Sequence, residues 1–148
     1  MIKRRIQVSG QAEAEYAADV ALAAQFDDLL AKARAAEQAF RKAQARARPI
    51  SEVYPLARNL DTALTDAMRA AYAAERAEIG PRGYEDRIYR RKAKARSAVH
   101  AWSDEAERLL TLRETHRLTG IPPAPRADLP SAEPGLDRPS GIVPHVPA

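Results

Sequence analysis

Three stretches of the chain carry residues at helical spacings of three, four or seven, most of them apolar, which places those residues along one face of a helix. The stretches cover residues 10–48, 51–79 and 84–119. The predicted inner faces consist of Leu22, Phe26, Leu29, Ala33, Ala36 and Phe40 in the first, Val53, Leu56, Leu60, Leu64, Ala67, Ala71 and the acidic Glu75 in the second, and Ile88, Ala95, Val99, Trp102, Ala106 and Leu109 in the third. The pattern predicts an all-α protein.

Short breaker segments separate the three predicted helices. Ser9 or Gly10 can cap the first helix, and Pro49 ends it. Ser51 can cap the second, and residues 80–83 (Gly-Pro-Arg-Gly) stop it. Short connections favour antiparallel neighbours, so residues 10–119 are predicted to form three long helices in an up-down-up antiparallel bundle. An alternative for the third helix is a break after Trp102, because the next three residues, Ser-Asp-Glu, are typical of a helix start.

Two arms flank the predicted bundle. In residues 1–9, Ile2, Ile6 and Val8 occupy even positions, as they would on one face of a strand, and a frayed terminus is the alternative. Residues 120–148 contain eight of the eleven prolines. A segment of this composition is expected to be irregular, because it buries too little apolar surface to fold alone.

The 45% hydrophobic content overstates how large a core the chain can form, because about half of those residues are alanines. An alanine buries about three carbons fewer than a leucine, or roughly 2 kcal/mol less hydrophobic free energy. A bundle with alanine along its apolar faces is therefore weakly held by its own core. Such a bundle is expected to pack closely on copies of itself or on other protein subunits.

The net charge of +4 leaves nucleic acid possible as a partner without requiring it. The candidate residues are Arg87, Arg90, Arg91 and Lys94, which line one flank of the third helix. Such a row can follow a phosphate backbone, or it can be an ordinary solvated helix face. Residues 80–83 have the length of a helix-turn-helix turn, but the helices on either side are too long for that motif.

Catalytic and metal-binding patterns are missing from the sequence. There is no cysteine, and His100, His116 and His145 are not spaced as metal ligands are. On the helix surface, Asp104 is expected to pair with His100 and Glu114 with His116. Neighbouring carboxylates at 27–28 and 104–107 point apart on a helix. No nucleotide-binding or nucleophile motif occurs, and we expect a non-enzyme without cofactor or metal.

The N-terminus is basic but is followed by Gln11, Glu13 and Glu15, which argues against a signal peptide. No window reaches the roughly 18 apolar residues of a membrane span. The sequence thus predicts a cytoplasmic protein without a membrane partner, or a virion component if the chain is assembled into a particle.

Long Ala- and Arg-rich helices with a basic arm and a proline-rich end resemble the style of small proteins that build phage particles. The main hypothesis is therefore a non-enzymatic structural or assembly subunit of a multi-copy complex, such as a phage capsid, connector or tail component. An accessory protein that binds nucleic acid is the alternative, and an adaptor presenting the proline-rich end is a third possibility. The residues predicted to dock on partners are Pro122, Pro123, Pro125, Leu129, Leu136, Ile142 and Val143.

Overall fold

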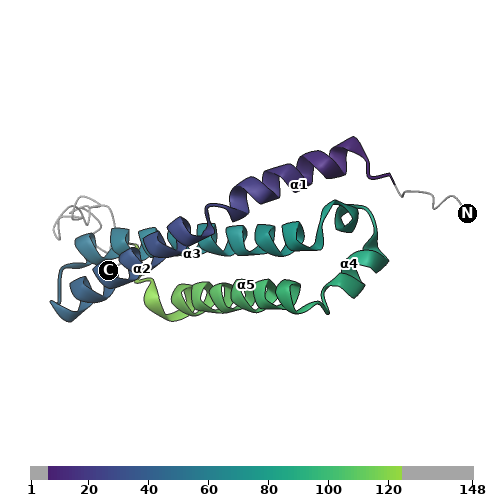
Figure 1. Cartoon of the computed structure of the whole chain (residues 1–148). Coiled ribbons are helices and arrows are strands. Elements are labelled where there is room, and N and C mark those ends of the chain that lie inside the picture. The colour runs from purple at the N-terminus through teal and green to yellow at the C-terminus, as the bar shows by residue number, and fades with distance from the viewer. Residues whose placement is uncertain (1–6, 125–148) are drawn as a thin grey trace, which may run out of the picture.

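The computed structural model describes residues 7–124, and these are entirely helical apart from the connections (Figure 1). The α helices are α1 (Gly10–Ala23), α2 (Phe26–Ala45), α3 (Ile50–Ile79), α4 (Arg87–Ala93) and α5 (Ser97–Thr115). A 3-10 turn, η1 (Pro81–Tyr84), follows α3, and a π-helical turn, η2 (His116–Gly120), follows α5. The all-α prediction is confirmed for this part of the chain.

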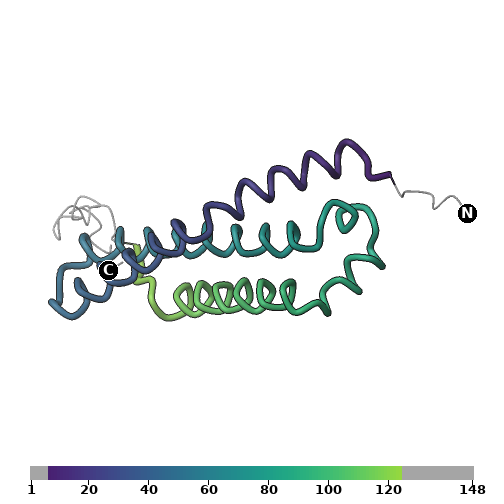
Figure 2. Tube along the Cα trace, viewed as in Figure 1, coloured from purple at the N-terminus to yellow at the C-terminus, as the bar shows by residue number. Residues whose placement is uncertain are grey.

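The central element is α3. It packs against α1 and α2 along one side and against α5 along the other, and its contacts with α2 and α5 are the most extensive in the fold. The chain path reverses direction after α2 and again across η1 and α4 (Figure 2). α3 is accordingly the helix with the most buried residues, among them Ala57, Ala67, Ala70, Ala71 and Ala73 at 0% exposure.

The first predicted helix is two helices. α1 ends at Ala23 and α2 begins at Phe26, although no glycine or proline separates them. The bend at residues 24–25 lets α1 reach η1 while α2 lies against α3. The prediction of one rod from 10 to 48 was therefore wrong, because tertiary contacts override the high helix propensity of alanine at the bend. Ser9 caps α1 as predicted, its Oγ accepting a hydrogen bond from the Ala12 amide at 3.2 Å.

The third predicted helix is also interrupted, at residues 94–96 and not after Trp102. Asp86 caps α4, and α5 continues through Trp102 and Ser103. The break folds α4 over the end of α3, where Ala93, Val99 and Ile79 form a small second core. Because α4 turns away from the main core, Ile88 is 68% exposed, and its predicted place on an inner face was wrong. Ala95 is exposed as well.

One smaller difference concerns α3, which begins at Ile50 with Pro49, not Ser51, in the capping position. Pro49 has an extended backbone, and its carbonyl accepts hydrogen bonds from the amides of Glu52 and Val53 at 2.9 and 3.1 Å. The guanidinium of Arg48 donates to both carboxylate oxygens of Glu52, each at 2.7 Å. This acidic residue in the first turn complements the helix dipole without a side-chain cap.

The core is built mainly from small side chains. Of the 20 buried apolar residues in the described chain, 11 are alanines, and Leu109 and Val99 are the large side chains that are fully buried. Phe26 meets Trp102 edge to face, with the ring centroids 5.1 Å apart, and this contact joins α2 to α5. The small side chains therefore let the helices approach closely, but they bury little apolar volume.

Candidate functional surfaces

A polar cluster joins α1 to the far end of α3. Asp19 is 14% exposed, and its carboxylate accepts two hydrogen bonds from the Arg76 guanidinium, at 2.7 and 3.0 Å. The Tyr84 hydroxyl of η1 donates to the same carboxylate. Burial raises the pKa of Asp19, but the hydrogen bonds from Arg76 and Tyr84 outweigh it, so that the pKa lies below its usual value. The pKa of the Tyr84 hydroxyl is raised, first by burial and then by Asp19.

Replacing Asp19 by asparagine is expected to destabilise the fold at neutral pH by about 1–3 kcal/mol, because α1 loses its charge-assisted contacts. The folded-state pKa of Asp19 is lowered, so its contribution is fully present above the unfolded pKa of about 3.9 and is lost as the pH falls through the folded pKa. Urea unfolding at pH 7 and pH 3 tests this. The difference from the native chain should shrink at pH 3, whereas the exposed-site control Asp27→Asn, which loses only an interaction with the dipole of α2, should differ from the native chain by less than about 1 kcal/mol at both. An unchanged difference at pH 3 would contradict the ion-pair assignment.

A second polar contact lies between α3 and α5. Glu75 is 8% exposed, and the Ser103 hydroxyl donates to it at 2.7 Å. The Lys94 Nζ lies 3.9 Å from the other carboxylate oxygen. This glutamate was placed on the inner face of its helix from the sequence, and the structure confirms the placement. The carboxylate is held by a hydroxyl and a distant cation, an arrangement that positions the two helices.

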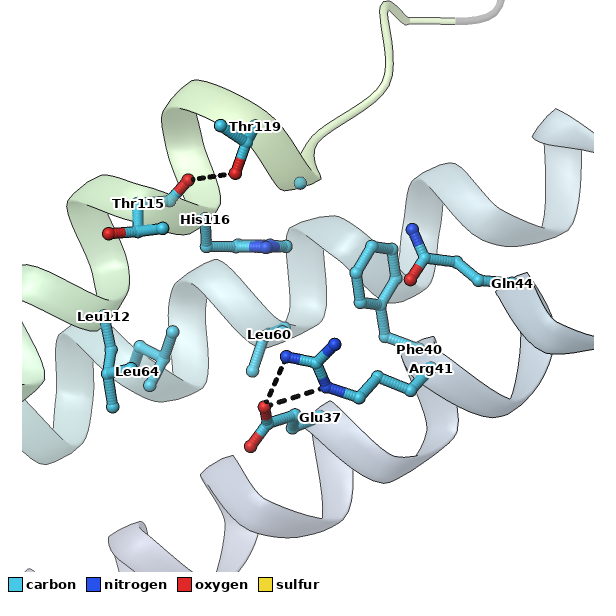
Figure 3. A pocket seen from close by; sticks show the side chains of 11 residues that line it. Glu37, Phe40, Arg41, Gln44, Leu60, Leu64, Leu112, Thr115, His116 and Thr119 are labelled. Atoms are coloured by element: carbon cyan, nitrogen blue, oxygen red, sulfur yellow. Dashed lines mark hydrogen bonds and ion pairs between the residues drawn. The ribbon is translucent and has the colours of Figure 1, made fainter.

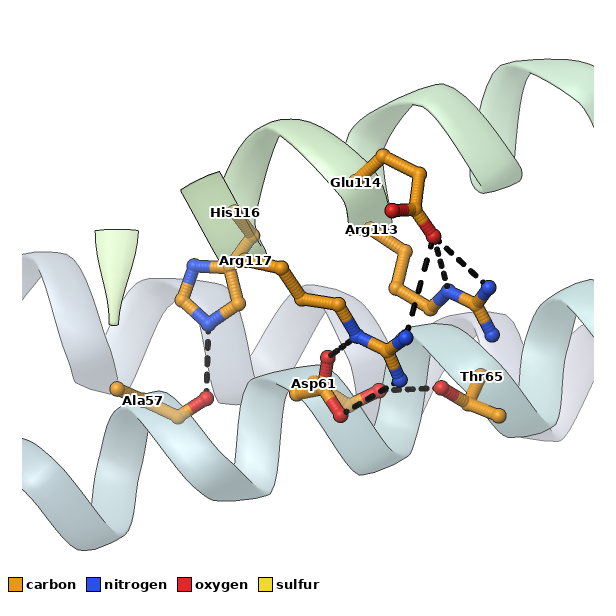
Figure 4. A network of polar contacts seen from close by, with 7 residues as sticks. All are labelled: Ala57, Asp61, Thr65, Arg113, Glu114, His116 and Arg117. Atoms are coloured by element: carbon orange, nitrogen blue, oxygen red, sulfur yellow. Dashed lines mark hydrogen bonds and ion pairs between the residues drawn. The ribbon is translucent and has the colours of Figure 1, made fainter. Parts of the chain in front are cut away.

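His116 is a structural residue at the start of η2. Its ring is 8% exposed, lies edge to face with Phe40 at 5.2 Å, and donates from Nε2 to the Ala57 carbonyl at 2.8 Å (Figure 4). A side chain on Gly120 would collide with this ring, which explains the glycine there. The predicted surface pair with Glu114 was wrong, because the buried ring turns toward α3.

Of the two acidic residues that the sequence predicts to pair with a histidine, Glu114 pairs with arginines and Asp104 pairs with its histidine. Glu114 pairs with Arg113 at 2.9 Å and lies 3.9 Å from Arg117. Arg117 also donates to Asp61 of α3 at 2.6 Å, which fastens η2 to the central helix (Figure 4). The pair predicted on α5 is confirmed, since the His100 Nδ1 lies 3.2 Å from an oxygen of Asp104.

A shallow pocket of about 260 Å³ lies beside His116, between α2 and the end of α5 (Figure 3). Its floor is formed by Leu60 and Leu64 of α3, and the partly exposed Leu112 lies on its rim. Glu37 and Arg41 line the α2 side and pair with each other at 3.0 Å. The charges of Glu37 and Arg41 therefore compensate each other at this side of the pocket.

Within residues 7–124, no group of three or more His, Cys, Asp or Glu side chains gathers that could hold a metal ion. Asp27 and Asp28 are both exposed in the first turn of α2. Over the same residues, no helix is long and apolar enough to cross a membrane.

Three of the predicted basic residues, Arg87, Arg90 and Arg91, lie on α4, and Lys94 follows directly after it, at the end of the molecule where α3 reverses into α5 (Figure 1). Arg87 and Arg91 are exposed, and the structure adds Lys92 to them, which was not among the predicted residues. Arg90 is partly used inside the fold, because it donates to the Gly83 carbonyl at 3.1 Å. We call residues 87–94 the α4 corner.

Sequence reasoning missed one surface, the outward side of α1. Its residues repeat at spacings of three and four on the side opposite the inner face, so the sequence contained the signal. The α1 outer face consists of the exposed small or apolar residues Ala14, Ala17, Ala18, Val20 and Ala21, together with Ala24 in the bend that follows the helix. Of the predicted docking residues, Pro122 is half-buried and Pro123 is exposed; Pro125, Leu129, Leu136, Ile142 and Val143 lie outside the described residues.

No family model, curated protein or solved structure matches this chain. Its function must therefore be argued from these surfaces alone.

Proposed function

We propose that this chain is a non-enzymatic structural or assembly subunit of a multi-copy complex, with a phage capsid, connector or tail as the setting that its sequence style suggests. The single observation that carries the proposal is the α1 outer face. It presents a row of alanines to solvent on a helix whose sole buried residue is Ala12.

An exposed helix face normally carries charged side chains, which keep it solvated. On α1, Ala14, Ala17 and Ala21 follow one another at spacings of three and four, Ala24 continues the row in the bend, and Val20 beside them is 43% exposed. Small side chains at this spacing let a second helix approach closely, as the a and d positions of a coiled coil do. The face is therefore suited to a helix of another subunit.

The energetics of α1 support the same conclusion. α1 fully buries one alanine and packs the partly buried Leu22 against the main core, which contributes little hydrophobic free energy for a helix of 14 residues. The ion pair between Asp19 and Arg76 adds a polar attachment. Isolated helices of this length are marginal in water. A partner helix on the α1 outer face would supply the missing burial.

In this proposal the helices form an up-down-up antiparallel bundle of three parts, which are α1 with α2, α3 alone, and α4 with α5. The terminal arms, residues 1–9 and 120–148, dock on neighbouring subunits. The docking residues would be those predicted from the sequence in the proline-rich segment. An adaptor that presents this segment to a separate domain is the weaker variant of the same idea.

The double variant Ala17→Glu with Ala21→Glu tests the proposal. Both side chains are exposed, so the substitutions should leave the helical fold intact while placing two charges in the subunit contact. We expect the native chain to sediment as an oligomer and the variant to shift toward monomer.

The matched control is Ala98→Glu with Ala101→Glu, which changes two exposed alanines of α5 and lowers the net charge equally. The control should sediment like the native chain. Identical monomeric sedimentation of all three proteins, with no association of the native chain with itself, would contradict a self-assembling subunit.

A further inference from the structure

α1 carries only negative charge beside the α1 outer face. The 14 residues of this helix include three acidic side chains and no lysine, arginine or histidine. Asp19 pairs with Arg76 inside the fold, but Glu13 and Glu15 are exposed, and neither has an ion-pair partner among residues 7–124. A helix that packs against the α1 outer face is therefore expected to carry positive charge.

α2 exposes a second row with small side chains, and the charge beside it has the opposite sign. The α2 outer face consists of Ala31, Ala35, Gln38 and Lys42, which are all exposed and follow one another at spacings of four, three and four. Residues 31–46 contain five basic side chains and one acidic side chain. Of these cations, Lys32, Lys42 and Arg46 are exposed and have no ion-pair partner in the described part of the chain.

From this complementarity we propose that the α1 outer face of one copy packs against the α2 outer face of a second copy. The inference rests on the proposed function and specifies its partner, because it names a second copy of this chain and the helix that this copy contributes. Alanines on both surfaces permit a close approach of the helix axes, and the opposite charges beside them favour α1 with α2. Two α1 helices would instead bring Glu13 and Glu15 of both copies together, and two α2 helices would bring their cations together.

The charges also favour an antiparallel direction of the two helices. When the alanine rows are aligned in this way, Glu13 at the start of α1 lies near Lys42 at the end of α2. The dipoles of antiparallel helices also attract each other. A parallel arrangement would place Glu13 beside Asp27 and Asp28 in the acidic first turn of α2, where like charges repel.

The α4 corner is another exposed basic surface, and it suits a partner helix less well. α4 has seven residues, and its single alanine, Ala93, is buried. Arg87, Ile88 and Arg91 are large side chains that are exposed on it. A helix could not approach these side chains as closely as it can approach the alanines of α2.

Sedimentation velocity of two charge variants, alone and mixed, tests the pairing over about a hundredfold range of concentration. The α1 variant, Ala17→Lys with Ala21→Lys, presents cations to the basic α2 outer face. The α2 variant, Ala31→Glu with Ala35→Glu, presents acidic side chains to α1. Each variant alone should self-associate at least about tenfold more weakly than the native chain, because like charges meet in the contact. All four positions are exposed and both new residues are good helix formers, so circular dichroism should show that the variants fold.

An equimolar mixture of the two variants should associate with an affinity within about threefold of that of the native chain. In the mixture, the native α2 of the first variant meets the native α1 of the second, and the introduced lysines meet the introduced glutamates. The matched controls change the exposed Ala98 and Ala101 of α5, to lysine for the α1 variant and to glutamate for the α2 variant. Both controls should sediment like the native chain.

Three results would overturn the proposal, and they separate it from the proposed function. If the α2 variant alone sediments like the native chain, α2 is not the partner, although a subunit that assembles through the α1 outer face remains supported. The same conclusion follows if both variants are monomeric and their mixture stays monomeric. If the native chain itself is monomeric at every concentration, no second copy binds, and the proposed self-assembly fails as well.

Discussion

Leu109→Ala is expected to lower the free energy of unfolding by about 2–5 kcal/mol. Leu109 is 1% exposed and is one of the two large side chains that are fully buried in the described chain. In a core where most buried apolar residues are alanines, few side chains lie nearby that could move into the cavity. Because small domains have a total stability of about 5–15 kcal/mol, this one truncation removes a large fraction of it.

Urea unfolding followed by circular dichroism measures this loss. Leu118→Ala is the matched control, since Leu118 is 84% exposed and its truncation should change stability by less than about 0.5 kcal/mol. Equal effects of the two truncations would show that the core is not organised around Leu109.

Ala106→Leu is expected to destabilise the protein by about 1–3 kcal/mol, even though it adds apolar surface. Ala106 is 0% exposed on α5, in the same core cluster as Ala67, Ala70 and Ala71 of α3. Small side chains on both helices let the axes approach closely, and three extra carbons would push them apart. The gain from hydrophobic transfer is smaller than the loss of contacts along both helices.

The control for this substitution is Ala101→Leu, at an exposed position one and a half turns earlier on the same helix. Leucine has nearly the helix propensity of alanine, so this variant should unfold like the native chain. If Ala106→Leu instead stabilises the protein, the contact between α3 and α5 contains free volume and the close-packing argument fails.

The helical class and most of the inner faces were predictable because they depend on periodicity. Phe26, Ala33 and Phe40 are buried as the spacing of the first stretch requires, and Leu60 and Leu64 are buried in α3. Proline and glycine correctly marked the ends of α3, at Pro49 and Gly80. These features are local and need no knowledge of the partners in space.

The helix breaks were not predictable by the same means. Residues 24–25 and 94–96 contain no glycine or proline, and their causes are contacts between distant parts of the chain. Asp19 meets Arg76 and Tyr84 only once the chain bends, and Val99 reaches Ile79 only once α4 folds over. Periodicity shows which face of a helix is apolar. It does not show where a helix must bend to stay in contact with its neighbours.

The candidate surfaces were predicted in part. Arg87 and Arg91 were identified from charge density, but only the structure separates them from Arg90, whose guanidinium is occupied by the Gly83 carbonyl. The α1 outer face was visible in the spacing of its alanines. Its significance depends on knowing that the opposite side of α1 faces α3, which is a tertiary fact.

Sedimentation velocity of the unmodified chain over about a hundredfold range of concentration tests most directly whether this alanine-rich fold needs other subunits. Mass action predicts an average sedimentation coefficient that rises with concentration, together with a midpoint of thermal unfolding that rises in parallel. A monomer whose sedimentation and unfolding midpoint stay constant over the whole range would contradict self-assembly as the source of its stability.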